Sequence, residues 1–350
     1  MESSQLSQAT SHKGLHIRES KLGKNLPGIL MVAIIAYIAD NIGKDLPLIG
    51  GTVIAILLGM LLKNFVGIPA VFNPGVQYSL KKLLKYAIIL LGTSMNLSQI
   101  FSIGGKSILV IIAVVLLGIG LTMFIGNKLM GLHGNVPILV GIGTAICGAT
   151  AIASVSPILK SKEEETAIAI TTIFMFNVIA VIFYPILGGF FGMSDEFFGI
   201  WAGSAIHDTS SVVAAGYAYS DASGGIATVV KLTRTLFLLP IAIILGVIVS
   251  IELRKQGTTG SKVNLVKIFP FFLLGFLAMA VLNTLGLFSE KVIENITIVS
   301  KFMILMAMAS VGLGTDFKKM SQIGLKPVYL GLIASVIVSV ISLTIIYIII

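Results

Sequence analysis

Long apolar stretches separated by short polar loops run through most of this 350-residue chain. A membrane-spanning helix needs about 20 predominantly apolar residues, and fewer where neighbouring helices cover its ends. By this measure the pattern predicts nine spans, at 26–39, 46–62, 79–95, 107–125, 167–191, 226–251, 268–287, 296–313 and 328–350. We therefore expect an all-α polytopic membrane protein in which residues 26–350 form a single transmembrane domain.

Two further apolar segments, 135–159 and 198–218, are interrupted midway by small and polar residues. Their centres read GTAICGAT from Gly143 and GSAIHDTS from Gly203, and they align without a gap at an offset of 60. Each segment is either a re-entrant hairpin that returns to its own side or a broken helix that crosses, which would give eleven crossings. We favour two hairpins that enter from opposite faces, with their tips near the middle of the bilayer.

Internal repeats accompany these segments. Each interrupted segment and the span after it form one repeat pair, 135–191 with 198–251. A second pair, 79–125 with 296–350, aligns at an offset of 220, where Lys81, Ala87, Gly92, Ile103, Gly104 and Lys106 match Lys301, Ala307, Gly312, Ile323, Gly324 and Lys326. With hairpins, the members of each pair run in opposite directions, and inverted repeats are typical of secondary-transporter folds.

Composition and charge predict the surroundings and the orientation. Only 11% of the residues are charged and 56% are hydrophobic, against about 25% charged in soluble domains. The lipid bilayer is therefore the required partner, and the net charge of +9 reflects basic cytoplasmic loops rather than nucleic-acid binding. With hairpins, 18 of the 24 Lys and Arg residues lie inside, counting the three lysines at the cytoplasmic end of the span 79–95. We expect a disordered cytoplasmic tail over 1–25 and an outside C-terminus.

Lys231 and Arg234 lie three residues apart within the predicted span 226–251 and therefore share one helix face. Charged side chains at bilayer depth are costly, and by default they mark a transport pathway. Because Arg binds oxyanions bidentately, we expect this pair to bind a small anionic substrate. The alternative is a location at the outer interface of the membrane.

His207 and Asp208 are a titratable pair at the second predicted tip. Histidine titrates near physiological pH, so we expect the pair to carry proton coupling; a structural salt bridge from Asp208 to Lys231 or Arg234 is the alternative. The rest of the predicted binding site consists of hydroxyl, amide and glycine residues, namely Thr144, Thr150, Asn177, Ser204, Thr209, Ser210, Ser211, Gly143 and Gly203. Close helix packing is the alternative role for the glycines.

Three motifs carry a resemblance to a known family: GIGTAICGATA at 141–151, GSAIHDTSSVVAAG at 203–216 and KLTR at 231–234. They resemble a bacterial membrane family described as sulfate exporters, over nearly the whole chain outside the tail. The resemblance implies the bacterial inner membrane as the location. That family is grouped with cation:proton antiporters and bile-acid-type anion transporters, which implies an inverted-repeat fold with interrupted helices.

We therefore expect a secondary transporter, and an exporter, of a small inorganic or organic anion such as sulfate or a sulfonate. A cation:proton antiporter-like carrier is the alternative within transport, but it would need paired carboxylates where only Asp208 qualifies. The chain has neither GxxxxGK[ST] nor HExxH, so we expect no enzyme, no cofactor and no metal site. A non-transporting membrane protein or an intramembrane enzyme remains an alternative, and a homodimer is compatible with the sequence.

Overall fold

The computed structural model describes residues 21–45, 50–255, 268–322 and 324–349, and every regular element in these ranges is helical. The predicted all-α polytopic class is confirmed, because six helical segments are long and apolar enough to cross a membrane. They are Gly23–Asp45, Leu97–Leu129, Glu163–Phe190, Asp221–Ile251, Glu290–Gly314 and Leu325–Ile349. Residues 1–20 of the predicted tail lie outside the described ranges, and helix α2 already begins at Lys21.

Two of the other three predicted spans are shorter helices, α3 (Gly50–Leu61), which a π-helical turn continues to Val66, and α15 (Phe272–Thr284). The third, 79–95, coincides with a π-helical turn (Ser79–Leu83) and α5 (Leu84–Leu91), which continue directly from α4 (Asn73–Tyr78). Helix α15 begins only after Pro270, whose missing N–H disfavours a helix interior. It ends before Gly286, which adopts a φ of 72°. Turn residues thus shorten a segment that the hydrophobic pattern alone predicts to be a full span.

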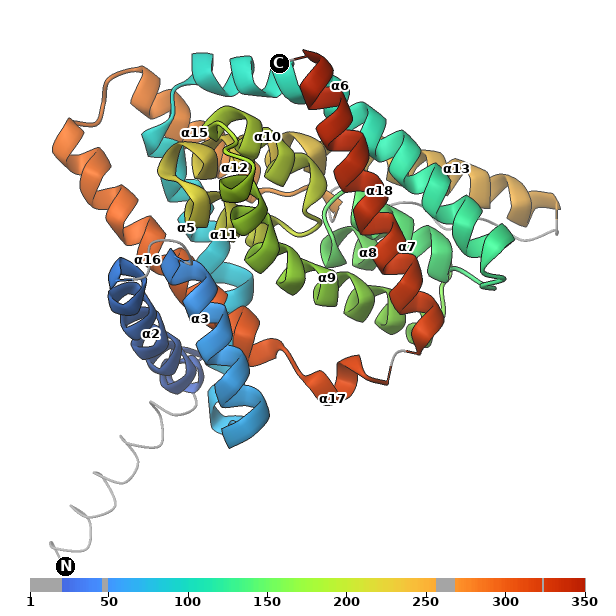
Figure 1. The fold of residues 1–350 in the computed structure, drawn as a ribbon, viewed down its shortest axis with the longest axis horizontal. Helices are drawn as coiled ribbons and strands as arrows, with labels where there is room; N and C mark the ends of the chain where they lie inside the picture. The colour runs from blue at the N-terminus through green and yellow to red at the C-terminus, as the bar shows by residue number, and fades with distance from the viewer. Residues whose placement is uncertain (1–20, 46–49, 256–267, 323, 350) are drawn as a thin grey trace, which may run out of the picture. The chain divides into compact units, whose positions relative to one another are not determined.

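Contacts divide the chain into two compact units, residues 1–87 with 298–316 and residues 88–297 with 317–350. Figure 1 shows the elements of both units, and each unit is described by itself. In both members of the predicted repeat pair 79–125 and 296–350, the chain passes from the first unit to the second.

Close glycine contacts hold the first unit together. It contains α2 (Lys21–Asp45), α3, α4 (Asn73–Tyr78) and most of α16 (Glu290–Gly314). A Cβ at Gly59 would lie 3.0 Å from the Cα of Gly312, and one at Gly28 would lie 2.7 Å from the Cα of Gly75. Small residues let backbones approach this closely in membrane helix pairs.

The second unit surrounds two short helical hairpins with long helices. The long helices are α6 (Leu97–Phe124), which a π-helical turn continues to Leu129, α9 (Glu163–Phe190), α12 (Asp221–Leu236) with α13 (Leu238–Lys255), and α18 (Leu325–Ile349). The short helix α17 (Phe317–Met320) precedes α18. One buried hydrophobic cluster packs around each hairpin, and both clusters include residues of α18.

Hairpin 1 is the first interrupted segment and consists of α7 (Val136–Ala145) and α8 (Ala149–Val155). The side-chain amide of Asn135, just before α7, donates to the carbonyl of Leu159, just after α8, at 3.4 Å. A Cβ at Gly143 would lie 2.8 Å from Cδ1 of Ile152 on the returning helix. The two half-helices therefore lie side by side, and the end of α8 returns to the start of α7.

Hairpin 2 is the second interrupted segment and consists of α10 (Asp195–Ala205) and α11 (Thr209–Tyr219). The ring of Tyr219 stacks on that of Phe198, with centroids 4.0 Å apart. The hydroxyl of Ser220 donates to Oδ1 of Asp195 at 2.6 Å. The end of α11 thus returns to the start of α10. Both interrupted segments therefore turn back on themselves as hairpins, and their re-entry from opposite faces of a membrane stays a prediction.

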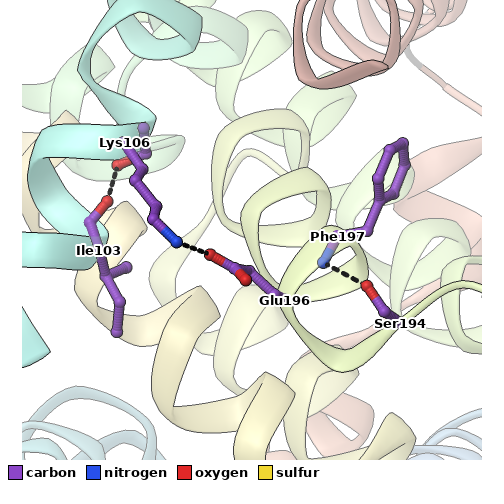
Figure 2. A network of polar contacts seen from close by, with 6 residues as sticks. Ile103, Lys106, Ser194, Glu196 and Phe197 are labelled. Carbon is purple, nitrogen blue, oxygen red and sulfur yellow. Dashed lines mark hydrogen bonds and ion pairs between the residues drawn. The ribbon is translucent and has the colours of Figure 1, made fainter. Parts of the chain in front are cut away.

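The hairpins approach each other from opposite ends of α6. The open end of hairpin 2 is fastened to α6 by an ion pair between Lys106 Nζ and Glu196 Oε1 at 2.7 Å (Figure 2). The open end of hairpin 1 lies 20 residues further along α6 and its π-helical turn, where a Cβ at Gly126 would meet Pro137. Between these points, a Cβ at Gly118 would lie 3.3 Å from Cβ of Ala145, at the tip of hairpin 1.

Candidate functional site

The tip of hairpin 1 depends on Gly148. This residue adopts a φ of 62° and a ψ of −136°, a conformation that is essentially restricted to glycine. Its N–H donates to the carbonyl of Gly143 at 2.8 Å and closes the turn. A Cβ at Gly148 would lie 3.2 Å from both Cβ and Oδ1 of Asp208. The tip of hairpin 1 therefore lies directly against the tip of hairpin 2.

Asp208 is the N-cap residue of α11, at the tip of hairpin 2. Its Oδ2 accepts the N–H of Ser210 at 3.0 Å and the hydroxyl of the same serine. This is the position where a carboxylate stabilises a helix, both as a cap and through the helix dipole. The backbone N–H of Asp208 donates to Oδ1 of Asn177 at 3.0 Å. Asn177 lies midway along α9, so this long helix fixes the second tip.

Lys231 on α12 binds the backbone of both tips. Its ammonium donates to the carbonyl of Ile146 at 2.8 Å, to that of Ile206 at 2.9 Å, and to that of His207. The side chain is 0% exposed. Three N–H donors thus find three backbone acceptors, one from hairpin 1 and two from hairpin 2.

Arg234, one turn further along α12, also binds the backbone of both tips, through four carbonyls. Its Nε donates to Ala145 at 2.6 Å, and its Nη1 donates to Ser204 at 2.5 Å and Ile206 at 3.1 Å. Its Nη2 donates to Thr144. The guanidinium is also 0% exposed, so neither cation reaches the surface of the protein.

The acceptors have a common origin in the ends of α7 and α10. The last carbonyls of a helix have no partner within the helix and must find donors elsewhere. Here the last residues of α7 and α10, and the breaks after them, direct these oxygens at α12. The two cations therefore join the tips while satisfying backbone groups that would otherwise be buried and unpaired.

The centre where the two tips meet carries a net positive charge. Among the described residues, no carboxylate lies within 4.0 Å of Lys231 or Arg234, so the alternative salt bridge from Asp208 to either cation is not formed. The C-terminal ends of α7 and α10 each carry about −0.5 charge, and the N-termini of α8 and α11 each carry about +0.5. With the two cations and the Asp208 carboxylate, the centre sums to roughly +1.

His207 connects the tips to α18. Its Nδ1 lies 3.2 Å from the carbonyl of Thr144, and its Nε2 lies 2.8 Å from the hydroxyl of Ser335. A carbonyl only accepts, so Nδ1 carries a proton. The Ser335 hydroxyl can donate either to Nε2 or to the carbonyl of Gly331, 2.7 Å away. It can therefore follow the protonation of the imidazole, although proton coupling itself stays a prediction.

The predicted hydroxyl residues divide into two groups. Thr144 and Ser204 are fully buried, and their hydroxyls bond backbone carbonyls of their own helices, Val140 at 2.7 Å and Ile200 at 2.6 Å. Nearer the surface lie Asp208 and Thr209, which are half-buried, and Thr150, which is exposed. Ser210 and Ser211 are buried in the first turn of α11. A ligand that approaches the tips from their accessible side would therefore meet Thr150, Asp208 and Thr209 first.

Gly143 and Gly203 are in close packing contacts. Gly143 packs against Ile152 within hairpin 1. A Cβ at Gly203 would lie 2.6 Å from Cβ of Val230, so this glycine sets the separation of hairpin 2 from α12. Their packing role is therefore visible in the structure, and their predicted binding role stays a prediction.

Sequence reasoning missed the serines of α18. Ser335 bonds His207, Ser339 accepts the indole N–H of Trp201 at 3.1 Å, and Ser342 lies 2.5 Å from the hydroxyl of Ser204. These three serines, which all contact hairpin 2, lie on one face of α18. The available signal was the spacing of these serines by four and three residues in an otherwise apolar span, which places them on one helix face.

The tips are closed to solvent at their centre, where His207 is only 2% exposed. A cavity of about 480 Å³ lies elsewhere, between the end of α8 and the start of α9. Its polar lining comes from Ser156, Lys160, Ser161, Glu163 and Thr166. The centre of the contact between the two tips is therefore enclosed by protein, while Thr150, Asp208 and Thr209 remain partly accessible.

The hairpin geometry predicts which positions share a side of the membrane. In a Cys147→Ser background, cysteines at His133 and Lys162 should react with an impermeant thiol reagent from one side, because both flank the open end of hairpin 1. Cysteines at Ser194 and Asp221 should react from the other side. All four positions are exposed. Labelling of positions 133 and 162 from different sides would contradict a re-entrant hairpin 1.

Comparison with known proteins finds similarity over nearly the whole chain. A family described as "Conserved hypothetical protein 698" matches residues 27–331. A UPF0324 membrane protein of Clostridium tetani is 38% identical over 327 residues, covering 90% of this chain and 94% of the relative. Relatives of the same name occur in Streptococcus agalactiae, at 38% identity over 92% of this chain and 96% of the relative, and in Fusobacterium nucleatum, at 35% identity over 92% and 97%.

Proposed function

Because the chain belongs to the membrane-protein family described as Conserved hypothetical protein 698, we propose that it is a secondary transporter of a small anion. The proposal rests also on the two hairpins of this chain, whose tips meet around buried cations. The carrying observation is the pair Lys231 and Arg234, both fully buried and without a carboxylate within 4.0 Å in the described part of the chain. Irregular backbone at membrane depth is tolerated where it lines a protein-enclosed or watery site.

The proposed substrate class is an oxyanion such as sulfate or a sulfonate. The centre has a positive balance, and the half-buried start of α11 offers backbone N–H and hydroxyl donors beside it. The specific choice of sulfate or sulfonate rests on the sequence resemblance. We propose export because an inside-negative membrane potential favours outward anion movement by roughly 2.3 kcal/mol per charge per 100 mV. Such a carrier needs neither ATP nor an enzymatic step.

A transport assay tests this proposal. Purified protein is reconstituted into liposomes loaded with labelled sulfate, and efflux is followed under an imposed potassium diffusion potential. Efflux should exceed that of protein-free liposomes, and unlabelled sulfate, methanesulfonate or a carboxylate should compete according to specificity. Lys128→Met, which alters an exposed lysine far from the tips, serves as a matched control and should transport like the parent. If no anion accelerates or competes, the proposed function is wrong.

Proton coupling has a specific structural basis in Asp208. Its carboxylate occupies the N-terminus of α11, where an anionic substrate would also be favoured. Protonation of Asp208 removes this competing charge and raises the positive balance of the centre. By thermodynamic linkage, anion binding and proton binding then strengthen each other by the same factor.

Asp208→Asn should mimic the protonated carboxylate and raise the affinity for sulfate. The amide carries no charge, so the variant loses the anion that competes with the substrate at the N-terminus of α11, and we expect a gain on the order of tenfold, or about 1.4 kcal/mol. Isothermal titration or ligand-induced thermal stabilisation measures this affinity in the parent and in the variant. An unchanged affinity in the variant would give Asp208 a capping role only.

A further inference from the structure

The Lys231 ammonium has an unusual set of neighbours for a buried cation. Its acceptors are three uncharged backbone oxygens, those of Ile146, Ile206 and His207, and none belongs to its own helix. They come from the breaks of two different hairpins, which the lysine reaches from a third element, α12. The Lys231 ammonium is therefore coordinated like a bound ion between the two tips, except that its own side chain tethers it to α12.

Uncharged carbonyl oxygens are the ligands that proteins use for monovalent cations. Rings of carbonyls bind potassium in channel filters, and carbonyls of unwound helices coordinate sodium in transporter folds. The spacings of 2.8 and 2.9 Å to Ile146 and Ile206 are ordinary N–H···O hydrogen-bond distances. The site therefore suits an ammonium-type ion.

The helices around this position create a need for positive charge. The C-terminal ends of α7 and α10, each carrying about −0.5 charge, both direct carbonyls at it. Without a cation between them, the carbonyls of Ile146 and His207 would lose the donor that the Lys231 ammonium supplies. Only the carbonyl of Ile206 would keep a donor, from Arg234. Arg234 satisfies the neighbouring carbonyls of Ala145 and Ser204 but does not reach Ile146 or His207 in the described structure. The ammonium position itself has to be filled.

We infer that the space between the two tips is a monovalent-cation site whose permanent occupant is the Lys231 ammonium. Transporters with interrupted helices bind a free cation from solution at such carbonyls. In this protein the cation is the side-chain ammonium of Lys231. It follows, on the basis of the proposed function, that anion transport proceeds without a coupling sodium or potassium ion.

Removing the tether should open the site to a free cation. Lys231→Ala deletes three methylene groups and the ammonium, which together correspond to propylammonium. We expect propylammonium chloride to raise the melting temperature of the purified full-length variant by about 3 °C or more over tetramethylammonium chloride of equal ionic strength. Ammonium chloride should have a smaller effect of the same sign. Tetramethylammonium carries the charge but has no N–H donor, so it separates site binding from salt effects.

Two matched proteins control this measurement. The parent keeps its tethered ammonium, and Lys231→Met fills most of the same volume with an uncharged chain, so neither should distinguish propylammonium from tetramethylammonium. A Lys231→Ala protein that ignores both salts, or responds equally to both, would overturn the inference. So would an equal propylammonium response in the parent or in Lys231→Met.

If Lys231→Ala aggregates on extraction, the amines are added throughout membrane solubilisation. Recovery of monodisperse protein with propylammonium but not with tetramethylammonium supports the site, and aggregation with both overturns it. In liposomes, sulfate efflux by the parent should be equal in sodium, potassium and choline media, and a sodium requirement would overturn the coupling-free consequence. Should the parent transport no anion, the proposed function fails, while the melting experiment still decides the cation site.

Discussion

Arg234→Met is expected to lower the free energy of unfolding by about 2–6 kcal/mol. Two of its four acceptors, Thr144 and Ile206, keep a second donor from His207 and Lys231. The carbonyls of Ala145 and Ser204 lose the donors that the guanidinium supplies. Each buried carbonyl left unsatisfied costs about 1–3 kcal/mol, against a typical total stability of about 5–15 kcal/mol. Unfolding in detergent, followed by heat or by titration with a denaturing detergent, measures the loss.

Two variants frame this result. Arg234→Lys keeps the charge but offers one compact ammonium in place of a planar fork, so its stability should lie between those of the parent and Arg234→Met. Lys128→Met removes an exposed cation and should stay within about 0.5 kcal/mol of the parent. If Arg234→Met melts with the parent, the guanidinium does not hold the tips together, and the hydrogen-bond account of the site fails.

Gly148→Ala is expected to be the next most damaging change, at about 1–3 kcal/mol. The backbone at this position has a positive φ that L side chains rarely adopt. The new methyl would also lie 3.2 Å from Cβ and Oδ1 of Asp208, so the carboxylate must shift from the place where it caps α11. We therefore expect a lower melting temperature together with a changed affinity for the anion.

The matched control is Gly120→Ala on α6. A Cβ at Gly120 would meet nothing within 4 Å, and alanine is favoured over glycine in a helix by about 1 kcal/mol. This variant should melt at or above the temperature of the parent. A Gly148→Ala protein that behaves like Gly120→Ala would show that the first tip relaxes freely, and that its contact with the second tip is not constrained.

The sequence predicted the hairpins because small and polar residues interrupted two apolar segments at equivalent positions. Gly143 and Gly203 mark these interruptions, and both segments do turn back beside themselves. The predicted spans that shortened, such as 268–287, show the limit of this reading. A hydrophobic pattern records which residues tolerate lipid or a protein core, whereas Pro270 and Gly286 set where the helix begins and ends.

The sequence by itself determined that this is an all-helical polytopic membrane protein, and that costly charges lie near the interruptions of two related segments. Hydrophobicity and the expense of buried charge act on each residue separately, so they can be read along a chain. Only the tertiary structure decided what those charges contact. Lys231 and Arg234 bind backbone carbonyls 24 to 90 residues away, and a carbonyl is present at every position, so no residue type marks an acceptor. Which oxygens are free follows from where α7 and α10 end and how the tips meet.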